Sequence, residues 1–215
     1  MKRTDYFFLF LLFLCWCCNS SDVTNKKTIS SAELTTAFNK IDSTKALIEN
    51  GDIIFRNGRD EVSQAARSMN RKDTSFSHCG LVFIEHDSVF VYHALGGSYN
   101  PGQKLKRELL DSFCTPLENN GFGLYRYAIK KDETDKLKSV VDNYYKAGLK
   151  FDMYFNYFSD DVMYCSEFVF KSLNKSVNGA YTKYVRLDTL PYGVTTDDIF
   201  LNENCRLISR QQFGW

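Results

Sequence analysis

One cysteine of this 215-residue chain has the surroundings that a nucleophile requires. Cys165 follows Tyr164 in the segment Met-Tyr-Cys-Ser-Glu-Phe-Val-Phe, and the spacing of apolar residues here predicts a helix over 164–173. A helix N-terminus carries partial positive charge and free backbone N–H groups. These features lower the pKa of a thiol and can hold an oxyanion. The pattern predicts a nucleophile at Cys165, with a packed, inert cysteine as the alternative.

A nucleophilic thiol also needs a base, and the chain offers three histidines. His78, His86 and His93 all fall in one predicted hairpin with its turn at 86–87. A two-residue turn would put His78 and His93 on one face as diagonal neighbours, about 7–8 Å apart. A three-residue turn would put them on opposite faces. We expect the two-residue turn, His78 as the base, His93 as the group that orients it, and an exposed His86 without a role.

Each of these residues also has a structural interpretation. His78 could be a strand-end residue with satisfied hydrogen bonds, and His93 could cap its strand. Three histidines so close together could bind zinc. Their spacing across a hairpin matches no known ligand pattern, so we expect no metal and no other cofactor. Cys79 should face away from His78, because successive strand residues alternate, and we interpret it as a core residue.

The elements that must position these side chains follow from periodicity and turn residues. In chain order we expect helices at 31–48, 61–69, 105–113, 132–146 and 164–173, and strands at 53–55, 77–85, 88–94 and 122–129. Residues 149–163 are aromatic and irregular, and the tail after 174 contains short extended pieces. Helices and hairpins without a βαβ rhythm indicate the α+β class.

Three segments, in this order, resemble a known family. They are Gly51-Asp-Ile-Ile-Phe55, Ser77-His-Cys-Gly-Leu-Val82 and Tyr164-Cys-Ser-Glu-Phe-Val169. Together with Phe151-Asp152 they resemble the YiiX/YebB-like branch of the NlpC superfamily, the permuted papain-like cysteine hydrolases. In this branch the histidine strand precedes the cysteine helix, as it does here. The resemblance implies an antiparallel sheet or half-barrel packed against helices, with the nucleophile at a helix N-terminus.

The same resemblance implies roles for individual residues. Cys165 would be the nucleophile, His78 the base, and a polar residue on the next strand would be the third member, which falls on His93. Many relatives carry glutamate at this third position. A neutral histidine can orient the base but stabilises an imidazolium less than a carboxylate would, so Glu85 and Asp52 are alternative orienting groups.

Two further residues are candidates for the wall of the site. Tyr164, beside the nucleophile, could donate to the oxyanion or simply line the cleft, and Asp152 is the second candidate lining residue. Glu167 points away from the thiolate, because two helical steps turn the side chain by about 200°. We interpret Glu167 as a structural carboxylate in the first helical turn.

The first eighteen residues are typical of an export signal. Lys2 and Arg3 precede an apolar run at 6–16, which is long enough for a signal peptide and too short to span a membrane. The run is followed by Cys18 and a polar stretch, which resembles a bacterial lipoprotein signal with Cys18 as the lipid-bearing residue. We expect a signal at 1–18, a tether at 19–30 and one hydrolase domain at 31–215, located in the periplasm or on the outer membrane. An ordinary cleaved signal peptide is the alternative.

Composition excludes some classes of protein. Lys and Arg total 27 against 26 Asp and Glu, and this balance argues against a nucleic-acid-binding protein. The four cysteines after the leader match no disulfide framework, so we expect mostly free thiols, with a bridge between Cys114 and Cys205 as the alternative.

These observations favour an exported cysteine hydrolase that cleaves an amide or acyl bond. Its substrate would be a cell-wall peptide or an N-acyl, lipid-like molecule, because aromatic residues at 151–158 could line an acyl-chain groove. A non-catalytic module that holds a cell-envelope ligand in a papain-like cleft is the main alternative, and a purely structural envelope lipoprotein is another.

Overall fold

A computed structural model of the chain describes residues 29–215, apart from the side chain of Tyr99. The signal expected at 1–18, with Cys18, and most of the expected tether lie outside these residues. The elements in chain order are α1 (Ser31–Lys45), β1 (Ile53–Gly58), α2 (Glu61–Ser68), β2 (His78–Glu85), β3 (Ser88–His93), β4 (Lys106–Leu109), α3 (Leu110–Phe113), β5 (Asn119–Tyr127), α4 (Lys131–Ala147), β6 (Lys150–Phe151), β7 (Val162–Met163), α5 (Cys165–Ser176), α6 (Thr196–Phe200) and β8 (Cys205–Gln212). Short 3-10 turns occur at Gly97–Tyr99 and Thr182–Tyr184.

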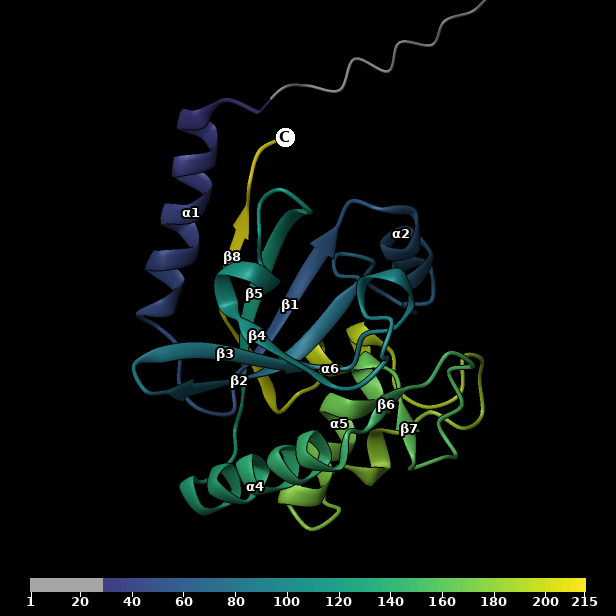
Figure 1. Ribbon diagram of the computed structural model, residues 1–215. Coiled ribbons are helices and arrows are strands. Elements are labelled where there is room, and N and C mark those ends of the chain that lie inside the picture. The colour runs from purple at the N-terminus through teal and green to yellow at the C-terminus, as the bar shows by residue number, and fades with distance from the viewer. Residues whose placement is uncertain (1–28) are drawn as a thin grey trace, which may run out of the picture.

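Six strands form one sheet in the order β4-β3-β2-β1-β5-β8 (Figure 1). Every neighbouring pair in this sheet runs antiparallel. β6 and β7 form a separate parallel pair shortly before α5. The histidine hairpin, β2 and β3, therefore lies beside the edge strand β4.

Side chains alternate between the two faces of the sheet, and each face has its own core. On β1, Ile53 and Phe55 join the core that α4, α5 and α6 cover, whereas Ile54 joins the core under α1 and α3. Figure 1 shows α4 and α5 on one side of the sheet and α1 on the other. An antiparallel sheet packed against helices confirms the predicted α+β class.

The hairpin has the expected two-residue turn. Glu85 pairs directly with Ser88. The turn residues His86 and Asp87 both have positive φ values, 48° and 62°, as a type I′ turn requires. This register gives β2 and β3 the parity that puts the two candidate catalytic histidines on the same face of the sheet.

The prediction of a helix at 105–113 is wrong over its first half. Lys106–Leu109 forms β4 and pairs with β3, and only Leu110–Phe113 is helical. Pairing with a neighbouring strand overrides the local helical spacing here. The tail also contains more structure than expected, because Cys205–Gln212 is a continuous strand paired with β5.

Within residues 29–215, none of the helices is long and apolar enough to cross a membrane. The cysteines in this range, Cys79, Cys114, Cys165 and Cys205, are free thiols, so the bridge considered between Cys114 and Cys205 is not formed. The same residues contain no cluster of His, Cys, Asp and Glu that could hold a metal ion.

Candidate active site

The candidate nucleophile is the first residue of α5. Cys165 follows the N-cap residue Tyr164, whose backbone N–H donates to the Glu167 carboxylate at 3.2 Å. Glu167 is buried and lies 2.8 Å from the Lys171 ammonium, and burial raises the pKa of its carboxyl to about 7. This carboxylate anchors the turn that presents Cys165, which matches the structural role expected for it.

The structure brings Cys165 and His78 together. Cys165 and His78 line the same groove, and the Cys79 thiol and the His78 imidazole both act electrostatically on the Cys165 thiol. The influence of Cys79, the larger of the two, and that of His78 lower the pKa of Cys165 well below its ordinary range, although burial opposes them. Burial and the contact with Cys165 raise the pKa of Cys79. Cys165 is therefore disposed to be the thiolate, with Cys79 as a core residue that donates to it.

His78 continues into a row of polar side chains. Its Nε2 lies 2.8 Å from Nδ1 of His93, and Nε2 of His93 lies 2.8 Å from Oε1 of Glu108. The second oxygen of Glu108, Oε2, lies 3.0 Å from Nζ of Lys106. The histidine expected to orient the base is in hydrogen-bond contact with it, and Glu108 adds a carboxylate that the sequence did not indicate.

A glycine makes room for this row of side chains. A Cβ atom on Gly80 would lie 2.6 Å from Cγ1 of Val91, 2.8 Å from the carbonyl oxygen of Tyr92 and 3.0 Å from Cβ of His93. Real Cβ atoms do not approach other heavy atoms this closely, so any side chain at position 80 would force β3 away from β2. The glycine in the Ser-His-Cys-Gly segment therefore keeps His93 within reach of His78.

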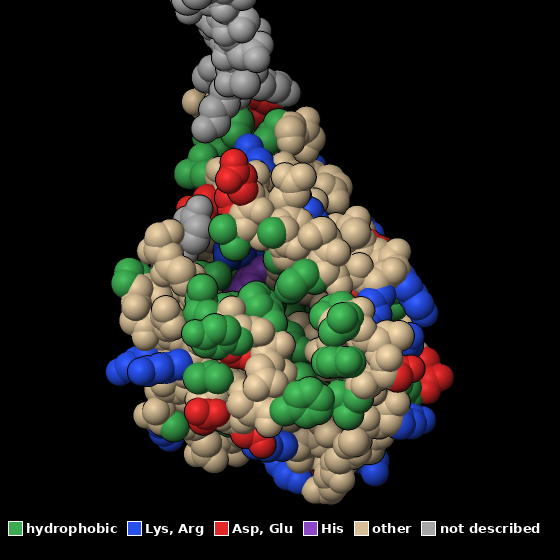
Figure 2. All heavy atoms as spheres, turned by 90° about the vertical axis from the view of Figure 1, so that its right-hand side faces the viewer, with side chains coloured by type: hydrophobic (Ala, Val, Ile, Leu, Met, Phe, Trp, Pro, Cys, Tyr) green, Lys and Arg blue, Asp and Glu red, His purple; other side chains and the backbone are tan. Residues whose placement is uncertain are grey.

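Cys165 and His78 both line an open groove with a volume of about 680 Å³. Figure 2 shows a histidine side chain at the bottom of a hollow that hydrophobic side chains surround. Cys165 retains only 9% of its exposed area, and this remainder faces the groove and a smaller adjoining pocket of about 40 Å³. The candidate nucleophile and base are therefore open to a ligand from one side. The groove is lined by Arg56, Gly58, Asp60, Val62, Ser63, Ala66, Ser77, His78, Leu95, Gly96, Gly97, Ser98, Lys106, Glu108, Ser112, Thr115, Glu118, Asn119, Phe151, Met153, Phe155 and Cys165.

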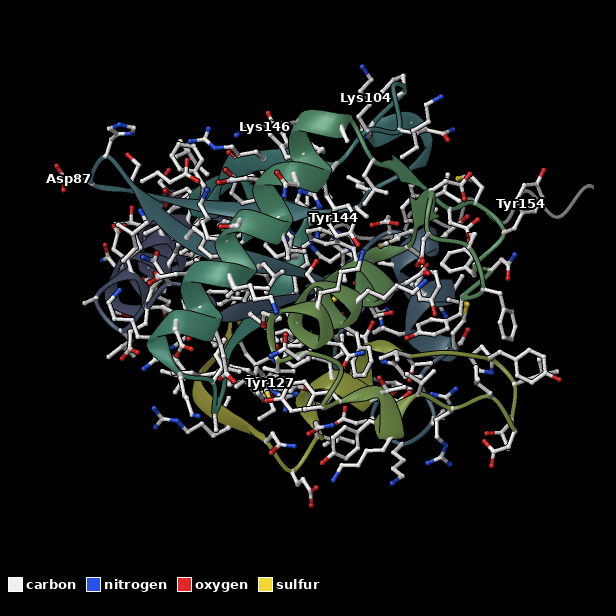
Figure 3. All side chains as sticks on the ribbon, turned by 90° about the horizontal axis from the view of Figure 1, so that it is seen from below. Asp87, Lys104, Tyr127, Tyr144, Lys146 and Tyr154 are labelled. Carbon is white, nitrogen blue, oxygen red and sulfur yellow. The ribbon has the colours of Figure 1, made fainter. Side chains whose placement is uncertain are left out.

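Aromatic and apolar side chains of the 151–158 segment border the groove. Phe151, Met153 and Phe155 lie on its wall, and Tyr154 projects into solvent with 92% of its area exposed. Figure 3 shows Tyr154 at the opposite end of the molecule from Asp87, the tip of the hairpin. The turn histidine next to Asp87 is exposed and lies outside the groove lining, as expected.

Of the two candidate lining residues, Tyr164 lies on a cavity wall, whereas Asp152 does not. Tyr164 lines the small pocket beside Cys165, and its hydroxyl accepts the Val194 backbone N–H at 3.4 Å. Asp152 is buried, and its carboxylate accepts the backbone N–H groups of Tyr154 and Asn156 at 2.8 and 2.5 Å. Asp152 is absent from the walls of both cavities described above, because its carboxylate organises its own loop.

The alternative orienting groups are engaged elsewhere. Glu85 accepts a hydrogen bond from the Tyr92 hydroxyl at 2.6 Å and pairs with Arg107. Asp52 accepts from the Arg126 guanidinium at 2.6 Å. Neither carboxylate contacts a histidine in the hydrogen bonds of the described residues, which leaves His93 as the group in contact with the base.

Comparison with known proteins identifies the family of the chain. Residues 47–198 match the family model of the permuted papain-like amidase enzymes, YaeF/YiiX, C92 family. The uncharacterized protein YiiX of Escherichia coli (strain K12) is 29% identical over 126 residues, which is 57% of this chain and 56% of that protein. The chain thus spans little more than half the length of this curated relative.

A solved structure shows the same fold. The crystal structure of metalloprotein yiiX from Escherichia coli O157:H7 covers 76% of this chain and 98% of its own, with a TM-score of 0.58 at 18% identity. The family match extends from before β1 to α6 and includes every residue of the row from Cys165 to Glu108. The chain therefore belongs to the C92 family of permuted papain-like amidases.

Proposed function

We propose that the protein is an exported hydrolase that cleaves an amide or related acyl bond through Cys165, His78 and His93. One observation carries this proposal: the thiol at the start of α5 and the His78 imidazole lie together on the wall of one open groove. The two side chains come from segments far apart in the sequence, and their shared position gives the thiol a base.

The proposed reaction follows from these positions. The Cys165 thiolate attacks the substrate carbonyl, and backbone N–H groups at the start of α5 stabilise the oxyanion. His78 protonates the leaving group and then activates water to release the acyl-enzyme. His93 holds the His78 ring through the 2.8 Å contact between their nitrogens.

The groove supports a substrate that has both a polar and an apolar part. Its volume of about 680 Å³ lies within the usual range of about 300–1,000 Å³ for small-molecule sites. Phe151, Met153 and Phe155 supply apolar wall, and Arg56 and Glu118 supply charge. A cell-envelope peptide and an N-acyl or lipid-like molecule both fit this description. Incubation with purified muropeptides and, separately, with N-acyl amides and phospholipids distinguishes them by mass spectrometry of the products.

Two substitutions test the mechanism. Cys165→Ala and His78→Ala should each abolish turnover of the substrate so identified, while circular dichroism and the melting temperature stay near those of the unmodified protein. Cys205→Ala is the matched control, because this half-buried thiol lies outside the groove lining, and it should retain activity. Full activity in both the Cys165 and the His78 variant would contradict the mechanism.

A non-catalytic module that binds a cell-envelope ligand makes a different prediction for the thiol. Such a module needs no thiolate, so Cys165 would titrate near 8.5 or above and resist iodoacetamide at neutral pH. The hydrolase requires rapid alkylation at Cys165, and peptide mass spectrometry identifies the modified cysteine.

We also propose that the protein is exported and anchored by a lipid on Cys18. This rests on Lys2, Arg3, the apolar run at 6–16 and the polar stretch after Cys18. Fractionation of cells should place the protein with the membranes, and Cys18→Ala should abolish labelling by a radioactive fatty acid. Recovery of the unmodified protein in the cytosol would contradict export.

A further inference from the structure

The two ring nitrogens of His93 are both in use. Nδ1 meets Nε2 of His78 and Nε2 meets Oε1 of Glu108, each at 2.8 Å. The His93 side chain has no exposed area, so water does not compete for either nitrogen. His93 therefore lies as a bridge between the base of the proposed mechanism and a carboxylate on β4.

The hydrogen atoms in this row can be assigned from the chemistry of its end group. A carboxylate only accepts hydrogen bonds, so the hydrogen on His93 sits on Nε2 and is donated to Glu108. A neutral imidazole then has a lone pair on Nδ1, which accepts the Nε2–H of His78. Nδ1 of His78 is the nitrogen left to meet the Cys165 sulfur. We propose that Glu108 is a positioning residue that acts through His93 to fix the tautomer of His78, an inference that rests on the proposed function.

Burial and nearby charges keep His93 neutral and Glu108 ionised, so the hydrogen atoms of the row keep the assigned positions. Burial lowers the pKa of His93 to about 3, so His93 stays neutral between two partners at neutral pH. Burial alone would raise the pKa of Glu108, but the His93 and Lys106 contacts lower it to about 2, so Glu108 stays a carboxylate. Arg56 on β1 is a further charged group that acts on His93, and it also disfavours an imidazolium there. The direction of the hydrogen bonds is therefore maintained over the range in which a hydrolase works.

Lys106 makes this inference testable with an almost isosteric change. In Glu108→Gln one carboxylate oxygen becomes an NH₂ group. The Lys106 ammonium, which only donates, lies 3.0 Å from Oε2 and would keep the amide oxygen on its own side. The NH₂ group would then face Nε2 of His93, which must become an acceptor. His93 would carry its hydrogen on Nδ1 and oppose the Nε2–H of His78.

The altered tautomer of His93 in Glu108→Gln also changes His78 beside the Cys165 thiol. Because Nδ1–H of His93 then faces Nε2 of His78, this Nε2 must become an acceptor. The hydrogen of His78 moves to its own Nδ1, the nitrogen left to meet the Cys165 sulfur. His78 can then neither take a proton from Cys165 nor form a stable imidazolium beside it. The corresponding wrong tautomer in a serine-protease triad lowers kcat by about 10⁴.

Nitrogen NMR of the purified, ¹⁵N-histidine-labelled protein reads the tautomers directly. The chain has only three histidines, and exposed His86 serves as an internal reference. The unmodified protein should show His93 protonated on Nε2, and Glu108→Gln should move this hydrogen to Nδ1. His93 found protonated on Nδ1 in the unmodified protein would overturn the inference without any variant, as would an unchanged spectrum in a folded Glu108→Gln protein.

Alkylation of Cys165 by iodoacetamide at pH 7 gives the second readout, and it needs no substrate. Glu108→Gln should slow alkylation at least about tenfold, which corresponds to a Cys165 thiolate fraction at pH 7 about one tenth of that in the unmodified protein. Adding Lys106→Met should restore much of the rate, because the amide oxygen is then free to turn to His93. A merely structural role for Glu108 predicts no such rescue. Glu85→Gln is the matched control, because the side chain of Glu85 is 17% exposed against 19% for Glu108 and is also ion-paired, and it should leave the rate unchanged.

These outcomes separate the two proposals. An unmodified protein whose Cys165 resists iodoacetamide would contradict the hydrolase mechanism, whatever the histidine spectra show. A reactive Cys165 whose rate is the same in Glu108→Gln would leave the hydrolase intact and refute the role of Glu108 alone.

Discussion

Replacement of His93 by glutamine should change how the stability of the protein depends on pH. A glutamine side chain can retain both contacts, since its oxygen accepts from His78 and its NH₂ group donates to Glu108. It removes the titration of a fully buried imidazole, whose pKa burial lowers to about 3. In the unfolded chain the same imidazole titrates near 6.5.

The sign and the size of the effect follow from proton linkage. Above pH 6.5 His93 is neutral in both states and adds no pH dependence. Between pH 6.5 and 3 the unfolded chain binds a proton that the folded protein does not, so acidification removes stability. At about 1.4 kcal/mol for each pH unit, lowering the pH from 7.5 to 4.5 should cost the unmodified protein about 3 kcal/mol through His93 alone.

Urea unfolding followed by circular dichroism at pH 7.5 and 4.5 measures this difference. Glu167 acts in the opposite direction, because its carboxyl pKa is raised to about 7 and folding takes up a proton there. Its contribution is common to both proteins and cancels when they are compared. On acidification the free energy of unfolding should fall by about 3 kcal/mol more in the unmodified protein than in His93→Gln. Parallel profiles would refute the buried, neutral state of His93.

Two further substitutions test the neighbours of the site. Gly80→Ala should destabilise the protein by about 1–3 kcal/mol and slow alkylation of Cys165, because the added Cβ would lie 2.8 Å from a carbonyl oxygen of β3. Unchanged urea unfolding in this variant would show that β3 does not need that close approach. Cys79→Ala should raise the pKa of the Cys165 thiol, since the Cys79 contact is the largest influence that lowers it. The pH dependence of the alkylation rate reads this pKa, and an unshifted profile would exclude Cys79 as a donor.

The position of the nucleophile at a helix start and the shared face of the two histidines could be predicted from sequence, because both depend on local rules. Apolar spacing located the start of α5, and the two-residue turn fixed the parity of the β2–β3 hairpin. That parity alone puts His78 and His93 on one face. The pairing of Cys165 with His78 required the family resemblance, because no local rule brings the start of α5 to the start of β2.

Glu108 could not be predicted in the same way. The segment around it has helical spacing, and as a helix it would have had no register with β3. Only the tertiary pairing of Lys106–Leu109 with β3 assigns this residue to a strand and to a face. Asp152 is absent from the walls of the two cavities, because its buried carboxylate accepts hydrogen bonds from the backbone of its own loop. The sequence alone does not distinguish such a carboxylate from one that lines a site.

The geometry of the sheet explains why an imidazole stands between the base and the carboxylate. His78 and Glu108 lie on β2 and β4, which are separated by β3, and strand axes lie about 4.8 Å apart. The imidazole of His93 on β3 stands between them and presents one nitrogen to each side chain. Lys106 pairs with His93 across β3 and β4, so Glu108, two residues later, shares its face. A slip of one residue would present Arg107 instead, and His93 would then face a group that cannot accept its hydrogen. The charge that supports the base therefore depends on the register of the edge strand as much as on the residues themselves.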